Sequence, residues 1–186
     1  MSRKRNIGAY LTLAFLLLTA LAHAADIMFH RLSIKEGDVF ASFSVVSYER
    51  KDIIEAIKRG LEGKVYYTIE VVEGSSFGFL GSRTVLRVNI KRSVKYDYWN
   101  KAFLVREVQK DTLCYSENAL FDLLFSVKNI RLGKVSRLMN RDYKLQVRAE
   151  LKSVHLYFPM NYVFKYVIGI WDFDTGWEMG PPLTMK

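Results

Sequence analysis

Cys114 and two of the histidines, His30 and His155, are the side chains of this chain best suited to nucleophilic catalysis. A thiol or a serine hydroxyl becomes a strong nucleophile when a neighbouring base accepts its proton. Cys114 or a serine, paired with His155, would therefore suit a hydrolase. A single histidine among strand residues is more often partly buried, and a cysteine beside apolar residues is more often buried and inert. A hydrolase is therefore the alternative prediction, and a protein without catalytic activity is the leading one.

Acidic residues near the C-terminus have two spacings that are known from reactive or metal-binding sites. Asp174-Thr175-Gly176 has the letters of an aspartic protease, but such enzymes need a second aspartate to share a proton. Asp172, Asp174 and Glu178 alternate around Gly176, as in a sparse calcium loop. Calcium needs about six to eight oxygen ligands, so a polar turn between the two flanking tryptophans is the favoured interpretation.

The remaining chemical groups indicate no cofactor. Two separated histidines and one cysteine do not make a zinc site. Neither a phosphate-binding loop nor a dinucleotide fingerprint occurs in the sequence. We therefore expect no metal and no organic cofactor.

Residues 1–24 have the three parts of a secretory signal peptide. Residues 3–5 are all basic, and residues 7–24 carry no charge and end in Ala22-His23-Ala24, with small residues where signal peptidase cleaves. An uncleaved anchor is the alternative, because a membrane span needs about 20 apolar residues. We expect a single exported domain at residues 25–186, either periplasmic or anchored to the inner membrane by residues 7–24.

Basic side chains concentrate in residues 126–155, which carry eight lysines and arginines against two acidic residues. The net charge of the whole chain is +9, so this stretch holds much of the excess and predicts one basic face. Export makes nucleic acid an unsuitable partner, so an anionic membrane surface or an acidic envelope protein is expected. The alternative is a solvated face that aids solubility and binds no partner. The residues expected to make the electrostatic contacts are Arg137, Arg141, Lys144, Arg148 and Lys152.

An aromatic segment follows the basic stretch. If its rings are exposed, they would provide the apolar part of the same contact surface. The residues expected there are Tyr162, Phe164, Tyr166 and Trp171. The alternative is that these rings lie in the core, and for Trp171 and Trp177 that alternative is favoured.

Strand and helix periods alternate along the mature chain. Residues 143–152 alternate strictly between apolar and polar, which predicts a strand with its cations toward solvent. Weaker alternation predicts strands at residues 39–45, 65–71 and 86–98, followed by a hairpin turn at Asn100-Lys101 and a returning strand.

Helical spacing occurs in three places. Residues 53–61 have apolar side chains on one side, and Ser116 is suited to cap a second helix whose stripe runs to Val127. Asn161 is expected to open a short helix that ends near Ile170. The order predicts an α+β fold, a single domain of mainly antiparallel sheet with two or three helices packed on it. A β-sandwich with helical insertions is the alternative.

Three segments resemble a bacterial domain-of-unknown-function family, number 4390. They are Gly60-Leu61 before an aromatic strand, the run from Ser93 to Phe103, and the run from Gly169 to Trp177. The resemblance implies a small exported or membrane-anchored protein without an established activity. Its members are often encoded near a nitrogen-regulation-type sensor kinase, which implies a link to envelope signalling.

The leading functional prediction is a non-enzymatic interaction module of the bacterial envelope. It rests on the basic stretch, the aromatic segment and the lack of a complete catalytic set. The alternatives are a periplasmic hydrolase and a ligand-sensing domain that acts with a sensor kinase. The sequence indicates no oligomeric state.

Overall fold

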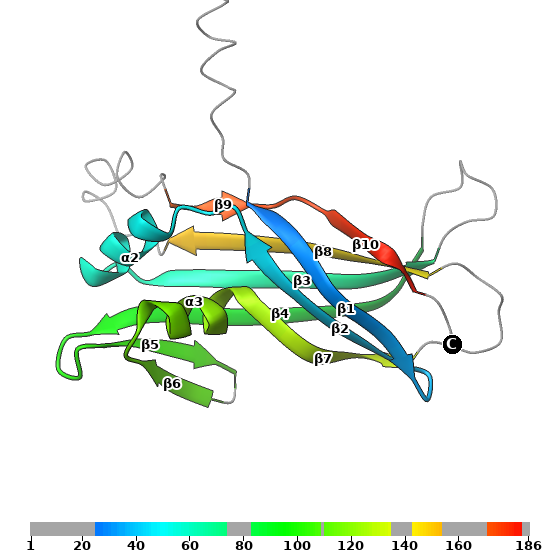
Figure 1. The fold of residues 1–186 in the computed structure, drawn as a ribbon, viewed down its shortest axis with the longest axis horizontal. Helices are drawn as coiled ribbons and strands as arrows, with labels where there is room; N and C mark the ends of the chain where they lie inside the picture. Colours follow the sequence, from blue (N-terminus) through cyan, green and yellow to red (C-terminus); the bar gives the residue numbers. More distant parts are fainter. Residues whose placement is uncertain (1–24, 74–82, 109, 135–142, 154–170, 184–186) are drawn as a thin grey trace, which may run out of the picture.

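The structure, a computed structural model, describes residues 25–73, 83–108, 110–134, 143–153 and 171–183. These residues form ten strands and two helices (Figure 1). In chain order they are β1 (Asp26–Lys35), β2 (Asp38–Val46), α2 (Arg50–Lys58), β3 (Gly63–Glu73), β4 (Arg83–Asp97), β5 (Ala102–Glu107), β6 (Lys110–Cys114), α3 (Glu117–Phe125), β7 (Ser126–Lys134), β8 (Tyr143–Ser153), β9 (Phe173–Asp174) and β10 (Glu178–Leu183).

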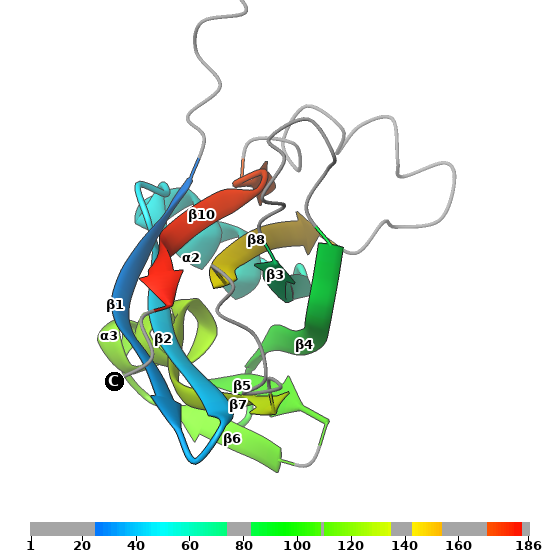
Figure 2. The same ribbon diagram turned by 90° about the vertical axis from the view of Figure 1, so that its right-hand side faces the viewer.

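The strands form two antiparallel sheets. The smaller sheet has the order β1-β2-β7, and the larger has the order β10-β8-β3-β4-β5-β6, with β9 paired to β8. Figure 2 shows β1 and β2 on one side of the molecule and β8, β3 and β4 on the other. The fold is therefore mainly antiparallel sheet with two helices among the described residues, which is compatible with the predicted α+β class but dominated by its strands.

The core lies between the two sheets. β2 buries every second side chain, and β8 does the same along its whole length. Phe43 from β2 meets Tyr67 from β3 with ring centroids 5.7 Å apart in an edge-on arrangement, and both rings are almost fully buried. These contacts confirm the strands predicted from alternation, because burial of one face is what produces a period of two.

Both helices lie at the same end of the sheets, where α2 joins β2 to β3 and α3 joins β6 to β7 (Figure 1). The predicted cap is present, since Ser116 Oγ accepts a hydrogen bond of 3.2 Å from the backbone N–H of Ala119. The second helix is shorter than predicted. It ends at Phe125, and Val127 is buried in β7.

A buried arginine joins α3 to the larger sheet. Arg92 Nη1 donates to the carbonyl oxygens of Leu123 at 2.7 Å and Ser126 at 2.9 Å, and its Nε donates to the Glu107 carboxylate. The last carbonyls of a helix have no partner within the helix. Arg92 therefore supplies both the donors and the positive charge that the C-terminal end of α3 needs.

Sequence periodicity did not predict strands β1, β6, β7, β9 and β10. β7 has two shifts in its register with β2, and Asn129 and Gly133 have φ angles of +50° and +131°. β1 has a register shift at His30. Each bulge offsets the alternation by one residue, so β1 and β7 lack a clean period of two.

Several expectations fall outside the described residues. These are the export segment at residues 1–24 and the short helix predicted from Asn161 to Ile170. No helix in the described ranges is both long and apolar enough to cross a bilayer.

Candidate functional site: a cationic sheet face

The outer face of the larger sheet collects cations from three neighbouring strands. Register pairs Tyr66 of β3 with Lys91 of β4 on one side and Glu150 of β8 on the other. The side chains facing away from the core form what we call the Tyr66 face, and its members are Lys64, Tyr66, Thr68, Glu70, Arg87, Asn89, Lys91, Lys144, Gln146, Arg148, Glu150 and Lys152.

Tyr66 lies on β3, the middle strand of this face, between two ammonium groups. Lys91 Nζ is 5.7 Å from the centroid of the Tyr66 ring, and Lys152 Nζ is 5.9 Å from it. Both distances are within the range of a cation–π contact. The half-buried ring therefore contacts one cation from each neighbouring strand, β4 and β8.

Acidic neighbours neutralise some of the cations. Arg148 pairs with Asp174 of β9 and with Glu150 at 3.1 Å, and Lys152 also pairs with Glu150. The hydrogen bond from Arg148 lowers the pKa of Asp174, and the one to Glu150 raises the pKa of Lys152.

Three lysines of the face have no acidic partner among the residues that the structure describes. Lys64, Lys91 and Lys144 make no ion pair with any residue that the structure describes. They come from three different strands, β3, β4 and β8. An anionic partner can therefore contact them together without breaking an existing salt bridge.

Glu70 is the buried acidic member of the face, with a side chain only 3% exposed. Burial raises the pKa of Glu70, but hydrogen bonds from Gln146, Arg87 and Thr84 outweigh burial and leave the pKa below its ordinary value. Glu70 thus ties β4 and β8 to β3 beneath the exposed cations.

This lowered pKa predicts a pH-dependent stability. Because the folded protein binds the proton of Glu70 less readily than the unfolded chain does, the contribution is complete above the unfolded pKa and is lost as the pH falls through the folded pKa. At pH 7, Glu70→Gln is expected to cost about 1–3 kcal/mol of unfolding free energy. The difference from wild type should shrink below about pH 5. Urea unfolding at several pH values measures it.

A matched control for Glu70 is Glu117→Gln, which removes the carboxylate of an exposed ion pair with Lys58. Exposed pairs contribute at most about 1 kcal/mol. An equal loss in both variants, or a loss at Glu70 that is the same at low and neutral pH, would contradict the role assigned to Glu70.

The structure brings together only part of the predicted basic surface. Lys144, Arg148 and Lys152 do lie on one face of β8. Lys128 instead pairs with Asp122 at 2.6 Å, and Arg131 pairs with Asp38 at 3.0 Å in the smaller sheet. The prediction that residues 126–155 form one basic face is therefore wrong.

Five of the predicted contact residues lie outside the described residues. They are Arg137, Arg141, Tyr162, Phe164 and Tyr166.

The two tryptophans near the C-terminus differ from each other. Trp171 is 3% exposed and packs over Gly63, so the prediction that it makes an exposed apolar contact is corrected in favour of the core alternative. Trp177 is 43% exposed, so the core position expected for it is wrong.

The contribution of Lys64 and Lys91 was missed. Lys64 has few basic neighbours in the sequence, whereas Lys91 lies in residues 83–95, which carry five basic residues and no acidic one. Strand pairing places Lys64 next to Lys152 and Lys91 next to Tyr66. Alternation within each strand was the available signal, but it does not indicate which strands are neighbours.

Polar side chains of residues 172–175 form hydrogen bonds with β8. Asp172 accepts a hydrogen bond of 2.7 Å from the backbone N–H of Ser153, and Thr175 Oγ1 accepts one of 3.0 Å from that of Ala149. Asp174 is engaged with Arg148. The described residues contain no group of three or more metal-ligating side chains. Asp172, Asp174 and Thr175 therefore have a structural role in a polar turn, which explains why residues typical of a protease motif or a calcium loop occur there.

The proposed nucleophile is poorly placed for catalysis. Cys114 is buried, and its burial raises the pKa of the thiol, which disfavours the reactive thiolate. Its proposed base, His155, lies outside the described residues. His30 Nε2 does contact Ser44 Oγ at 2.8 Å, but the described residues include no group that hydrogen-bonds the other ring nitrogen of His30, as the orienting member of a triad would.

Gly74-Ser75-Ser76-Phe77-Gly78 has the letters of a nucleophile elbow, a motif that the sequence analysis missed. The segment itself lies outside the described residues. A nucleophile elbow joins a strand to a helix, whereas here the strands on either side, β3 and β4, are antiparallel neighbours. The motif therefore lacks the structural context that its chemistry needs.

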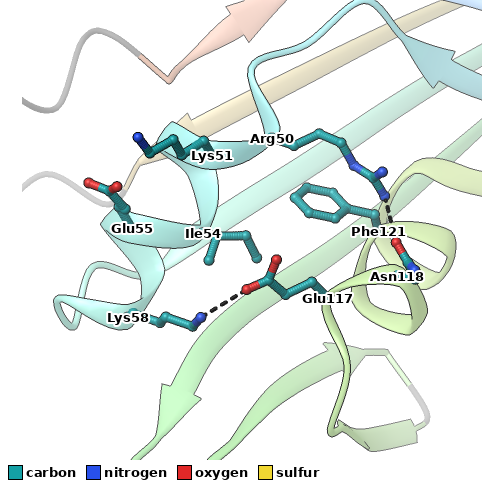
Figure 3. A pocket seen from close by; sticks show the side chains of 8 residues that line it. All are labelled: Arg50, Lys51, Ile54, Glu55, Lys58, Glu117, Asn118 and Phe121. Atoms are coloured by element: carbon teal, nitrogen blue, oxygen red, sulfur yellow. Dashed lines mark hydrogen bonds and ion pairs between the residues drawn. The ribbon is translucent and has the colours of Figure 1, made fainter.

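A hollow of about 420 Å³ lies between the two helices (Figure 3). Lys58 Nζ and a Glu117 carboxylate oxygen, 2.8 Å apart, close one side of it. The Arg50 guanidinium lies over the Phe121 ring at 4.4 Å. Lys58 with Glu117 and Arg50 with Asn118 thus pair across the hollow, while Glu55 pairs with Arg59 beside it.

No family model, curated protein or solved structure matches this chain.

Proposed function

We propose that the protein is a non-enzymatic interaction module of the bacterial envelope that binds anionic headgroups through the Tyr66 face. The observation that supports this most directly is that Lys64, Lys91 and Lys144 lie on one face of three neighbouring strands. Lys91 contacts the half-buried Tyr66 ring, Lys64 is two residues from it on β3, and Lys144 lies farther along the face, opposite Val72. Nothing in sequence alone would bring these charges together.

The character of the face favours a lipid surface over a folded protein partner. Protein interfaces usually have an apolar core surrounded by a polar rim, but Tyr66 is the one aromatic side chain of this face. Long lysine side chains around a flat surface suit headgroup phosphates, each attracted by about 1 kcal/mol per cation near an anionic membrane. An acidic envelope protein is the second partner that this charge would attract.

The envelope location in this proposal comes from the sequence. It rests on the signal-peptide pattern at residues 1–24 and on the resemblance to family 4390. Either form of that segment, cleaved or anchored, would leave the domain at residues 25–186 within reach of a membrane surface.

Sedimentation with lipid vesicles tests the proposal. The domain should bind vesicles rich in anionic lipid at low salt and bind zwitterionic vesicles weakly, with an affinity that falls as salt is added. Combined replacement of Lys64, Lys91 and Lys144 by glutamate is expected to weaken binding to anionic vesicles about 100-fold.

The control carries the same change of charge on other elements. Lys35→Glu, Lys51→Glu and Lys110→Glu alter exposed residues of β1, α2 and β6. If the control triple variant loses as much affinity as the face variant, net charge and not the Tyr66 face governs binding. Absence of binding to anionic vesicles at low salt would rule out the lipid partner.

A further inference from the structure

The tip of the β4–β5 hairpin carries the most exposed large apolar side chain of the described residues. Trp99 is 98% exposed, and the adjacent Tyr98 is 60% exposed. A tryptophan in such a position contributes almost nothing to the free energy of folding, because it buries almost none of its apolar surface. The ring is therefore available for a partner.

Hydrogen bonds hold the turn in one conformation. Asp97 Oδ1 accepts from the backbone N–H of Trp99 at 2.9 Å and of Asn100 at 3.1 Å, and Asp97 Oδ2 accepts from Asn100 Nδ2 at 2.8 Å. The bonds from Asn100 lower the pKa of Asp97, so its charge stays engaged within the turn. Trp99 thus projects from a pre-organised support.

Aromatic rings brace the base of the hairpin. Tyr96 contacts Phe103 across the strand pair with ring centroids 5.3 Å apart, and it contacts Tyr98 at 5.1 Å. The Tyr98 hydroxyl donates to the backbone carbonyl of Lys58 at 2.9 Å, at the end of α2. This bracing keeps Tyr98 and its neighbour Trp99 away from the core.

Cations flank the exposed ring. Lys101 lies in the turn itself, and Lys95 precedes the turn on β4. Both side chains are exposed, and neither makes an ion pair with a described residue. Lys95 shares the outward side of β4 with Lys91. The charged row of the Tyr66 face therefore continues along β4 to the hairpin tip.

We propose that the β4–β5 hairpin is a membrane anchor that places Trp99 in the headgroup region of an anionic bilayer while Lys95 and Lys101 contact its phosphates. The inference rests on the proposed function and adds the apolar contact that the Tyr66 face lacks. Tryptophan and tyrosine prefer the interface between water and hydrocarbon, because the ring is apolar and its N–H or O–H remains hydrated. In a protein interface, a central tryptophan is usually surrounded by other contact residues. At the tip of this hairpin, the large apolar side chains exposed beside Trp99 are limited to Tyr98 among the described residues.

Tryptophan fluorescence of the Trp177→Phe protein tests the insertion. In that variant Trp99 is the one solvent-exposed tryptophan, since Trp171 is buried. Addition of vesicles rich in anionic lipid should shift the emission to shorter wavelength, and lipids brominated near the headgroup should quench it. Trp99→Ala is expected to weaken vesicle binding about 10-fold, while Trp177→Phe alone should leave it unchanged.

The outcomes separate this inference from the proposed function. Binding to anionic vesicles that depends on the three lysines but is unaffected by Trp99→Ala, with no emission shift, overturns the anchor and leaves the proposed function intact. Loss of binding in Trp99→Ala with the three lysines unimportant supports the anchor and overturns the Tyr66 face. Absence of any vesicle binding overturns both. Circular dichroism of each variant shows that the fold is retained.

Discussion

Replacing Arg92 with alanine is expected to lower the free energy of unfolding by about 3–5 kcal/mol. The Arg92 side chain is 11% exposed and holds the Glu107 carboxylate together with the carbonyls at the end of α3. Alanine would leave those oxygens without their donors and leave Glu107 without its counter-ion. The guanidinium also lies 5.8 Å from the centroid of the buried Tyr67 ring, so a favourable cation–π contact is lost as well.

Chemical denaturation at neutral pH measures this loss, and Arg106→Ala is its matched control. Arg106 pairs with Asp111 at 3.2 Å on the neighbouring strands, but both side chains are more than half exposed. Its removal should change stability by less than about 1 kcal/mol. If Arg92→Ala costs no more than the control, the buried arginine is not what secures α3 to the sheet. Arg92→Lys keeps the charge but not the multiple donors, so it should fall between wild type and alanine.

Replacing Phe43 with alanine is expected to cost a similar amount, about 3–5 kcal/mol. Phe43 is fully buried and reaches from β2 across the core to Tyr67 of β3, while its other side contacts Phe29 with ring centroids 6.4 Å apart. Alanine would leave a cavity between the sheets that neither neighbour can fill without moving its strand. The midpoint of thermal or urea unfolding measures the effect.

Phe43→Leu is the comparison that isolates the cavity. Leucine keeps most of the apolar volume and removes the edge-on contact with Tyr67, so it should cost clearly less than alanine. A loss under about 1 kcal/mol in Phe43→Ala would show that this part of the core is solvent-filled or loosely packed, contrary to the two-sheet arrangement described above.

The strands that could be predicted from sequence are those with one uninterrupted buried face. β2, β3 and β8 bury alternate residues along their length or most of it, so their period of two is legible in the sequence. β1 and β7 carry bulges, and β6 has only five residues. In β1 and β7 a bulge interrupts the buried face, and β6 is too short to show a repeated alternation of apolar and polar residues.

The candidate site was predictable only in part for a related reason. Arg148 and Lys152 were identified because their strand is rich in cations, yet both prove to be paired with acidic neighbours. Lys64 comes from a stretch of ordinary composition, whereas Lys91 lies in residues 83–95, whose five basic residues and lack of acidic ones were a signal that the prediction did not use. Local charge density in a sequence does not report ion pairing, because the acidic partner of a residue on β8 can follow it by 26 positions, as Asp174 follows Arg148.

Four properties can be read from the order of the residues alone: strands with one apolar face, a capped helix, one cysteine that cannot form a disulfide within the chain, and an excess of positive charge. Those properties depend on each residue and its near neighbours. The tertiary structure decided which charges remain free, that Trp171 is enclosed and Trp99 displayed, and that Arg92 is buried beneath a helix end. These outcomes depend on strand order and register, which arise from contacts between segments far apart in the chain.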